Sequence, residues 1–152
     1  MMDLRGRSCR ISLLRDDDEY SYSEGDRIEF RTDGFDIQSS KEELQINLYD
    51  LPPLIREQDW IIVGEGGRVQ GEVVEITRTS FIIDVKQAGV IYSYDCVKIP
   101  GNRIQQLPIV PLEDKVDMKE ICTKYCFDFV TLPNTMSGRD IQELRALLGS
   151  EN

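Results

Sequence analysis

The stretch WIIVGEGGRVQGEVVEITRTSFIIDV, residues 60–85, decides the fold class of this chain. It holds three runs rich in β-branched residues, at 60–63, 69–76 and 80–85, and such runs are typical of strands. The glycine-rich segment 64–67 separates the first two runs, and the short segment 77–79 separates the second and third. Both connections have the length of hairpin turns, so we expect consecutive strands folded back on each other.

More strands are predicted on both sides of this stretch. Residues 27–31 alternate between polar and apolar side chains, as a strand with one buried face does, and they are followed by the turn signal Asp33-Gly34. The other predicted strands are residues 9–14, residues 44–48, and a final pair at 90–92 and 96–99. Short strands with turns roughly every ten residues indicate a small β-sandwich or β-barrel.

The pattern changes after Pro108. We expect a helix at 112–125, followed by a β-type run at 127–132 and a second helix that begins near Ser137. The first helix would turn inward Val116, Met118, Ile121, Cys122 and Tyr125, and the second would carry an apolar stripe of Ile141, Leu144, Leu147 and Leu148. Ser137 and Asp140 have the spacing of a capping box. The fold class is therefore mainly β, with a C-terminal α-β-α fragment that cannot complete a parallel sheet alone.

Charge and composition exclude several classes of function. The chain carries 18 Lys and Arg against 28 Asp and Glu among its 152 residues, a net charge of −10, and it has no histidine. The negative charge argues against binding to nucleic acid or to anionic membranes, because both need a basic surface. The lack of histidine excludes Ser-His-Asp and Cys-His catalysis and His-ligated zinc. No run could span a membrane and no signal peptide is recognised, so we expect a cytoplasmic protein.

Three motifs allow a chemical interpretation, but a structural one is favoured for each. Residues 64–67, Gly-Glu-Gly-Gly, could cradle a phosphate, yet β-type residues follow where such a loop needs a helix, so a hairpin bend is favoured. The acidic run 16–19 could hold a cation but lacks EF-hand spacing, so a solvated turn is favoured. Cys122 and Cys126, four residues apart, favour a buried thiol pair over a metal site or a regulatory disulfide.

Five segments of the chain, taken in order, are similar to the motifs of one enzyme family. Residues 2–11 are similar to the family's strand Leu-Asp-Thr-Lys-Gly-Pro-Glu-Ile-Arg-Thr, and residues 51–66 to its Leu-Pro stretch that ends in Asp-Asp-Gly. Residues 97–101 are similar to Val-Asn-Leu-Pro-Gly, and residues 107–114 to the Leu-Pro segment that re-enters the barrel at an aspartate. Residues 128–149 are similar to Asp-x-Val followed by Asp-x-x-Glu-x-Arg-x-x-Leu-Gly. In this order, and along nearly the whole chain, these motifs resemble those of the pyruvate kinase family.

This resemblance implies a small β-barrel lid inserted into a (β/α)₈ barrel of the TIM type, only part of which is present. Residues 1–12 would be a barrel-strand remnant, residues 13–101 the lid domain, and residues 102–152 a helix-strand-helix remnant of the barrel. The resemblance assigns Asp3 to a remnant of the potassium site and Arg10 to a remnant of the nucleotide-phosphate site. It places Gly64, Glu65 and Gly66 in the lid loop.

The resemblance also implies that functional positions are altered. Leu4 replaces the threonine beside the potassium-binding aspartate, and Gly64 and Glu65 replace the paired aspartates of the lid. Residues 133–136, Pro-Asn-Thr-Met, replace the Ser-Phe-Ile-Arg loop at the barrel mouth. The family's catalytic lysine and magnesium-binding acids lie beyond this sequence. We therefore expect no catalytic residue, no metal and no cofactor in this chain.

These observations favour a catalytically inactive pyruvate-kinase-like protein that acts as a structural or interaction module in a larger assembly. The alternative is the lid-bearing part of a split or active pyruvate kinase, which would use magnesium and potassium, and a plain β-barrel binding module is a third hypothesis. Two parallel strands cannot close a barrel. The apolar residues Phe129, Val130, Ile141, Leu144 and Leu148 therefore need a cover, which we expect a protein partner or a homo-oligomer to supply.

Overall fold

The computed structural model describes residues 1–16, 19–99, 102–122, 124–125 and 127–149. The chain folds into two compact units, one formed by Met1–Ser8 with Gln105–Asn152 and the other by Cys9–Ile104. We call the first the α/β unit, because it combines strands with helices, and the second the β unit. Because the α/β unit is built from both ends of the chain, the β unit is an insertion into it.

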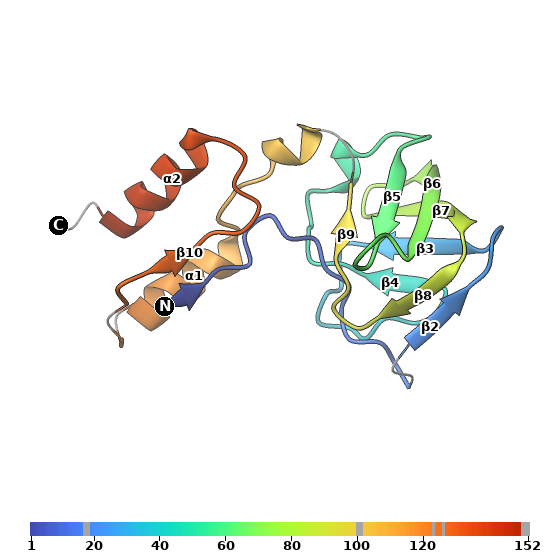
Figure 1. Ribbon diagram of the computed structural model, residues 1–152, viewed down its shortest axis with the longest axis horizontal. Helices are drawn as coiled ribbons and strands as arrows, with labels where there is room; N and C mark the ends of the chain where they lie inside the picture. Colours follow the sequence, from blue (N-terminus) through green and yellow to red (C-terminus); the bar gives the residue numbers. More distant parts are fainter. Residues whose placement is uncertain (17–18, 100–101, 123, 126, 150–152) are drawn as a thin grey trace. The chain divides into compact units, whose positions relative to one another are not determined.

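The β unit is a small barrel of short strands (Figure 1). Its main sheet has the strand order β4-β3-β7-β6-β5-β9, while β2 and β8 form a separate antiparallel pair. The strands are β2 (Glu19–Tyr22), β3 (Arg27–Arg31), β4 (Glu43–Gln45), β5 (Trp60–Val63), β6 (Val69–Ile76), β7 (Ser80–Gln87), β8 (Gly89–Tyr92) and β9 (Val97–Lys98), with short 3₁₀ helices at Pro52–Leu54 and Asn102–Gln106. The predicted hairpins of the 60–85 stretch are confirmed, since β6 pairs antiparallel with both β5 and β7.

Residues 9–14 connect the two ends of the main sheet. Arg10 forms an isolated antiparallel bridge with Cys96, next to β9, and Ile11 forms one with Ile46, next to β4. The segment was predicted as a strand, but it makes single bridges in place of a continuous ladder. It nevertheless links β9 to β4, the two edges of the sheet, and so closes the barrel.

Strands form at both segments that were predicted as a final pair, but they do not pair with each other. β8 pairs with β2 over four residues, whereas β9 pairs with β5. The chain turns between them, with Tyr94 in the left-handed region at φ 64° and the amide of Asp95 donating to the carbonyl of Tyr92 at 3.2 Å. This turn sends β9 to a different neighbour, so the two strands do not form a hairpin.

The core of the β unit lies between the inward faces of its strands. Phe30 of β3 and Phe81 of β7 are fully buried, and their rings stack with centroids 5.1 Å apart. Ile28, Ile83 and the other apolar residues of the alternating pattern are buried in the same way. The alternating pattern of residues 27–31 therefore corresponds to side chains that point in turn into the core and toward the surface.

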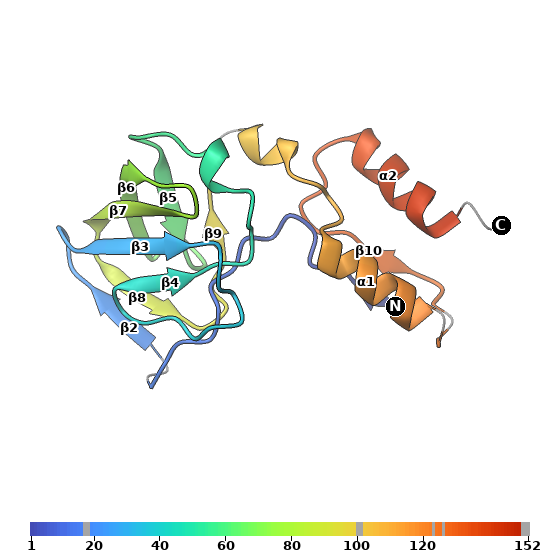
Figure 2. The same cartoon turned by 180° about the vertical axis from the view of Figure 1, so that it is seen from behind.

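The α/β unit contains a two-stranded parallel sheet and two helices (Figures 1 and 2). Its elements are β1 (Met2–Asp3), α1 (Leu112–Cys122), β10 (Val130–Thr131) and α2 (Gly138–Gly149). Met2 lies opposite Val130, and Asp3 lies opposite Thr131. The apolar cluster of this unit contains Met2, Leu4, Ile109, Val110, Met118 and Leu144. It draws on both strands and both helices, with Val130 packed against it from β10.

Helix α1 corrects part of the predicted inward face. Met118 is buried and Ile121 packs against the cluster, as expected, but Val116 and Tyr125 are exposed. The helix ends at Cys122, three residues before the predicted limit, so Tyr125 no longer follows its periodicity. The side chain of Cys122 and all of Cys126 fall outside the described residues, and so does the predicted thiol pair.

At the start of helix α2, Asp140 makes the contact that the predicted capping box assigns to it, while the N–H of Asp140 donates to the backbone carbonyl of Ser137 at 3.2 Å. The carboxylate of Asp140 accepts the backbone N–H of Ser137 at 3.0 Å and that of Met136 at 2.8 Å.

Among the described residues, neither helix has the length and apolar content that a membrane crossing requires.

Candidate functional site

Asp3 projects from β1 beside a hydroxyl of β10. The parallel register places Thr131 opposite Asp3, and its Oγ1 donates to Asp3 Oδ1 at 2.6 Å. The next residue, Leu4, is buried in the apolar cluster and offers no side-chain oxygen. Asp3 and Leu4 therefore do not fit a potassium site to which the side chains at both positions supply an oxygen ligand. The role of Asp3 as a remnant of such a site stays a prediction.

The turn after β1 is held by Asp114 of α1. Asp114 is buried, and its Oδ1 accepts the backbone N–H of Arg5 at 3.1 Å while its Oδ2 accepts that of Gly6 at 2.8 Å. The Arg5 side chain also donates to Asp117 at 2.6 Å, and this bond raises the pKa of Arg5. Gly6 has φ 58°, and a Cβ there would lie 2.9 Å from the carbonyl oxygen of Pro133. Only glycine fits this turn without strain.

Arg7 and Asp140 form a buried ion pair in the α/β unit. Arg7 is 6% exposed and Asp140 is 4% exposed, and the guanidinium donates to both carboxylate oxygens, at 2.9 and 3.1 Å. Its Nε also donates to the carbonyl of Leu107 at 2.7 Å. Arg7, followed by the N–H groups of Met136 and Ser137, lowers the pKa of Asp140 to about 2. Arg7 is therefore fully engaged inside the protein.

The loop at 133–136 is held by the same network. Met136 donates its N–H to Asp140, and Asn134, at φ 55°, donates through Nδ2 to Ser8 Oγ at 2.9 Å. Thr135 Oγ1 donates to the carbonyl of Leu132 at 3.0 Å. The loop thus binds back onto its own unit, and Arg7, which shares Asp140 with Met136, is committed to that carboxylate.

In the β unit, Arg10 keeps an accessible guanidinium. Its Nη1 donates to the carbonyl of Tyr94 at 3.1 Å, and its backbone N–H donates to Asn47 Oδ1 at 2.8 Å. The side chain is exposed and forms no ion pair with any residue that the structure describes. Arg10 could therefore meet an anion, and its assignment to nucleotide phosphate stays a prediction.

The lid-loop residues form the bend between β5 and β6. Gly64, Gly66 and Gly67 all have φ between 70° and 79°, which favours glycine at each. The strand β6 follows, so the hairpin interpretation holds and the phosphate-loop one does not. The N–H of Gly64 donates to the carbonyl of Cys96 at 2.9 Å, and Arg10 bridges the same residue. The bend and Arg10 therefore meet at one segment, while Asp3 belongs to the other unit.

Arg68 was not predicted as a functional residue, yet it organises this end of the β unit. It donates to both oxygens of Asp95, and to the carbonyl of Val90 at 3.1 Å. Its guanidinium lies 4.9 Å from the centroid of the Tyr92 ring. A Cβ at Gly64 would come within 2.7 Å of it. The hydrogen bonds to Asp95 raise the pKa of Arg68, whose charge is thus neutralised within the unit.

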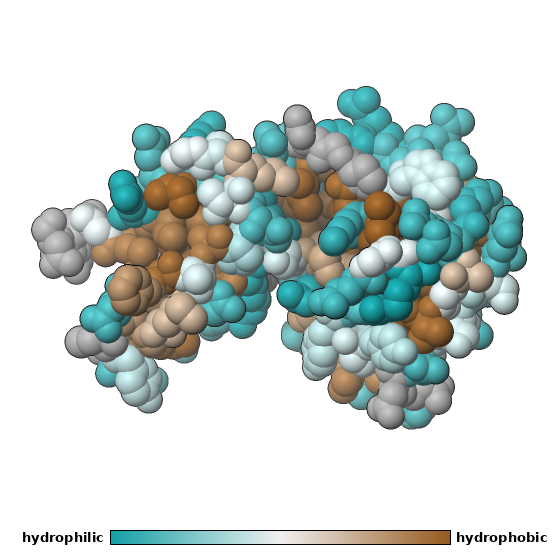
Figure 3. Space-filling view, in the orientation of Figure 1, coloured by the Kyte–Doolittle hydropathy of each residue, from teal (hydrophilic) through white to brown (hydrophobic). Residues whose placement is uncertain are grey.

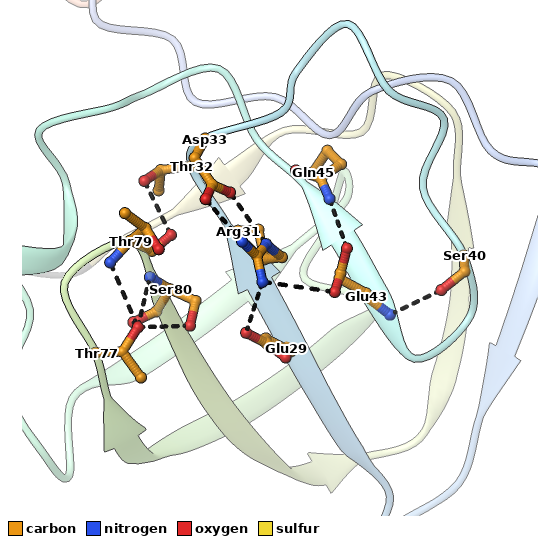
Figure 4. A network of polar contacts seen from close by, with 10 residues as sticks. All are labelled: Glu29, Arg31, Thr32, Asp33, Ser40, Glu43, Gln45, Thr77, Thr79 and Ser80. Carbon is orange, nitrogen blue, oxygen red and sulfur yellow. Dashed lines mark hydrogen bonds and ion pairs between the residues drawn. The ribbon is translucent and has the colours of Figure 1, made fainter.

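A second polar network ties β3 to β4 (Figure 4). Arg31 makes two hydrogen bonds to Asp33, at 2.7 and 3.0 Å, and lies within 4 Å of Glu29 and Glu43. A positive charge thus sits among the three carboxylates. No group of three or more Asp, Glu or Cys residues in the described part of the chain could hold a metal ion. Asp17 and Asp18 of the acidic run lie outside that part, so the predicted solvated turn is not described.

The α/β unit has an apolar cavity of about 720 Å³ between β10 and α2. Figure 3 shows hydrophobic side chains gathered on this face. The lining residues are Tyr125, Phe127, Asp128, Val130, Thr131, Leu132, Ile141, Leu144, Arg145 and Leu148. Of the residues predicted to need a cover, Phe129 is 72% exposed and Ile141 and Leu148 are also exposed, whereas Val130 is half-buried and Leu144 is buried.

Comparison with known proteins gives a consistent picture. The family model for the barrel domain of pyruvate kinase matches residues 1–152. Two solved structures of Cryptosporidium parvum pyruvate kinase are similar to this chain at 22% identity over 95% of its length. The TM-score is 0.83 for one and 0.75 for the other, which is in complex with ADP. The chain spans only 29% and 28% of those two proteins. No curated protein matches it.

Proposed function

Because this chain belongs to the pyruvate kinase family, we propose that it is a catalytically inactive member that serves as a structural or interaction module in a larger assembly. The observation that carries this proposal is the buried pair of Arg7 and Asp140. The guanidinium of Arg7 is bound to Asp140 and to the carbonyl of Leu107, and Arg7 is almost fully buried. Residues 133–136 themselves carry no cationic side chain that could meet a substrate.

Two further positions support loss of activity. Leu4 is packed in the apolar cluster, so the cation position beside Asp3 lacks one oxygen ligand. Gly64 has no side chain and lies against Arg68, whose charge is already balanced by Asp95. The lid loop therefore presents one carboxylate, that of Glu65, where the family has two. Each change removes a charged or oxygen-bearing group from the position where the family uses one.

The interaction role is supported by the exposed apolar face of the α/β unit. A parallel sheet is normally buried on both faces, yet the two-stranded sheet of this unit borders an open apolar cavity. Exposed apolar patches beside polar residues are typical of interaction sites. A partner that covers the cavity would complete the unit.

The test is turnover together with nucleotide binding. The purified chain is incubated with phosphoenolpyruvate, ADP, Mg²⁺ and K⁺, and pyruvate is measured with an active pyruvate kinase as the positive control. We expect no pyruvate above the protein-free blank, and no heat of binding when Mg-ADP is titrated in a calorimeter. Pyruvate formation by this chain would overturn the proposal.

A second candidate function is the lid-bearing part of an active pyruvate kinase. It is favoured by Arg10, whose guanidinium stays exposed and without a carboxylate partner among the described residues. On this hypothesis Arg10 contacts a nucleotide phosphate, and Arg10→Ala would weaken Mg-ADP binding at least about tenfold, the effect of losing one charge-assisted hydrogen bond. Arg78→Ala, which removes a charge from the turn at 77–79, is the matched control.

A further inference from the structure

We propose that Asp33-Gly34, in the turn after β3, is a site of spontaneous isoaspartate formation, and that the side chain of Arg31 protects it. This inference goes beyond the proposed function and does not depend on it. It concerns the β unit alone. Because the reaction is intramolecular, it does not depend on which surfaces of the unit are covered.

The sequence supplies the reactive pair. Asp33-Gly34 is the single Asp-Gly pair of the chain, and there is no Asn-Gly pair. In such a pair the backbone nitrogen of the glycine can attack the side-chain carbonyl carbon of the aspartic acid, because glycine has no Cβ to hinder the approach.

The reaction needs no reagent other than water. A C–N bond forms between the two residues, and the hydroxyl of the acid leaves with the amide hydrogen as water, which gives a cyclic imide. Water then adds to the main-chain carbonyl of this ring and opens it, so that the chain continues through the former side chain. The product, isoaspartate, is an isomer of aspartate.

The attacking nitrogen is available, and the fold keeps a glycine at its position. Within the described part of the chain, the N–H of Gly34 donates no hydrogen bond, whereas its carbonyl accepts the N–H of Ile37 at 2.8 Å. A Cβ at position 34 would lie 2.9 Å from Oε1 of Gln45, a buried side chain that a larger residue would have to displace. The packing of the turn therefore favours the residue that makes Asp33 reactive.

The carboxylate, by contrast, is held by Arg31. Nε and Nη2 of Arg31 donate to the two oxygens of Asp33 at 3.0 and 2.7 Å (Figure 4). This bidentate contact fixes the orientation of the carboxylate and favours its ionised form, so the pKa of Asp33 is lowered. The ionised form is a poor electrophile, because the acid must lose a hydroxyl group. Glu29 and Glu43 lie farther from the guanidinium, at 3.9 and 3.8 Å, so they compete weakly for it.

The test follows isoaspartate at position 33 while the purified chain is kept at neutral pH and physiological temperature for several weeks. Peptide mass spectrometry with electron-transfer fragmentation distinguishes the two isomers. Arg31→Gln should raise the rate about fivefold, the upper end of what an exposed ion pair contributes. Arg31→Lys keeps the charge but loses the bidentate geometry, so its rate should lie between the two. The unmodified chain should react faster in urea than in its folded state.

Arg27→Gln is the matched control, because Arg27 lies on the same strand and pairs with Asp84. It should leave the rate unchanged, and Trp60 fluorescence checks that each variant is folded. If Arg31→Gln does not fold, Arg31→Lys and the comparison with urea carry the test.

Three results would overturn the inference. The first is a chain that forms no isoaspartate at position 33 even in urea. The second is a folded chain that reacts as fast as the Arg31→Gln variant or as the unfolded chain. The third is an equal acceleration by Arg27→Gln. Pyruvate formation would instead overturn the proposed function and leave this inference standing.

Discussion

The two units of this protein bury their apolar residues to very different extents. In the β unit, Phe30, Phe81 and their neighbours are wholly inaccessible, and the charged residues lie outside. In the α/β unit a cluster of six buried side chains stands beside Phe129, Ile141 and Leu148, which face solvent. The two units also differ in net charge. The β unit has 11 basic and 19 acidic residues, and the α/β unit has 7 basic and 9 acidic residues.

A closed sheet satisfies its edges within its own unit, whereas an open sheet needs other parts of the protein to cover its edges and faces. The β unit closes its own sheet through residues 9–14 and needs no partner to satisfy its edges. The α/β unit has two parallel strands, and parallel strands are stable when both faces are covered. Its stability should therefore depend on its internal ion pair and on what covers its cavity.

The largest expected effect comes from breaking the core of the β unit. Phe30→Ala should lower the free energy of unfolding by about 3–5 kcal/mol, because it removes one ring of the buried stack and leaves a cavity. Trp60, the single tryptophan of the chain, lies on β5, so its fluorescence during urea unfolding reports on this unit. Ile37→Ala, at an exposed site, should change the free energy by less than about 0.5 kcal/mol. Equal effects for both would contradict the self-contained core.

A smaller effect is expected from the core of the α/β unit. Leu144→Ala should cost about 2 kcal/mol, the low end for a buried leucine, because Leu144 borders the open cavity and water can enter the space that is left. The helical signal in far-UV circular dichroism should melt earlier, while the unfolding midpoint from Trp60 fluorescence stays where it was. If both signals shift together, the two units unfold as one and the contrast drawn between them is wrong.

The smallest effect, and the one that isolates the ion pair, is a pH dependence. The pKa of Asp140 is lowered to about 2, below its ordinary value of about 3.9, so the ionised carboxylate stabilises the α/β unit above about pH 4. That stabilisation is lost as the pH falls through about 2. The melting temperature of the helical signal should therefore drop between pH 5 and pH 2. Asp140→Asn should melt earlier at neutral pH and show a flatter profile. Parallel profiles for the two proteins would exclude Asp140 as the source.

The local pattern of the sequence predicted the elements of the β unit well. The runs at 60–63 and 69–76 coincide with β5 and β6, and the alternating residues 27–31 coincide with β3. Each of these strands carries its signal in consecutive residues, through β-branching or period-two alternation. The pairing of β8 with β2, by contrast, joins residues that are far apart in sequence, and no local pattern encodes which neighbour a strand takes.

The candidate site was predicted less well, for the same reason. Arg7 and Asp140 are 133 positions apart, and Arg68 and Asp95 are 27 apart, so neither pair leaves a periodic trace. Asp140 was recognised through its short-range role at the start of α2 and through its place in the family motif, and neither indicates that it pairs with Arg7. The resemblance to pyruvate kinases directed attention to Asp3, Arg10 and the 64–66 bend. It could not indicate that an arginine at position 7 would be buried, because the family motif has proline there.

The segment of residues 9–14, where the chain enters the β unit, lies next to β9, close to where the chain leaves it. The N–H of Val97 donates to the carbonyl of Cys9 at 2.9 Å. The first residue of the β unit therefore lies beside β9, the last strand of the unit. Inserts with neighbouring ends can be gained or removed with little disturbance to the host. Residues 9–104 thus have the form of a transplantable cassette, which protein engineers could splice into a surface loop of an unrelated scaffold.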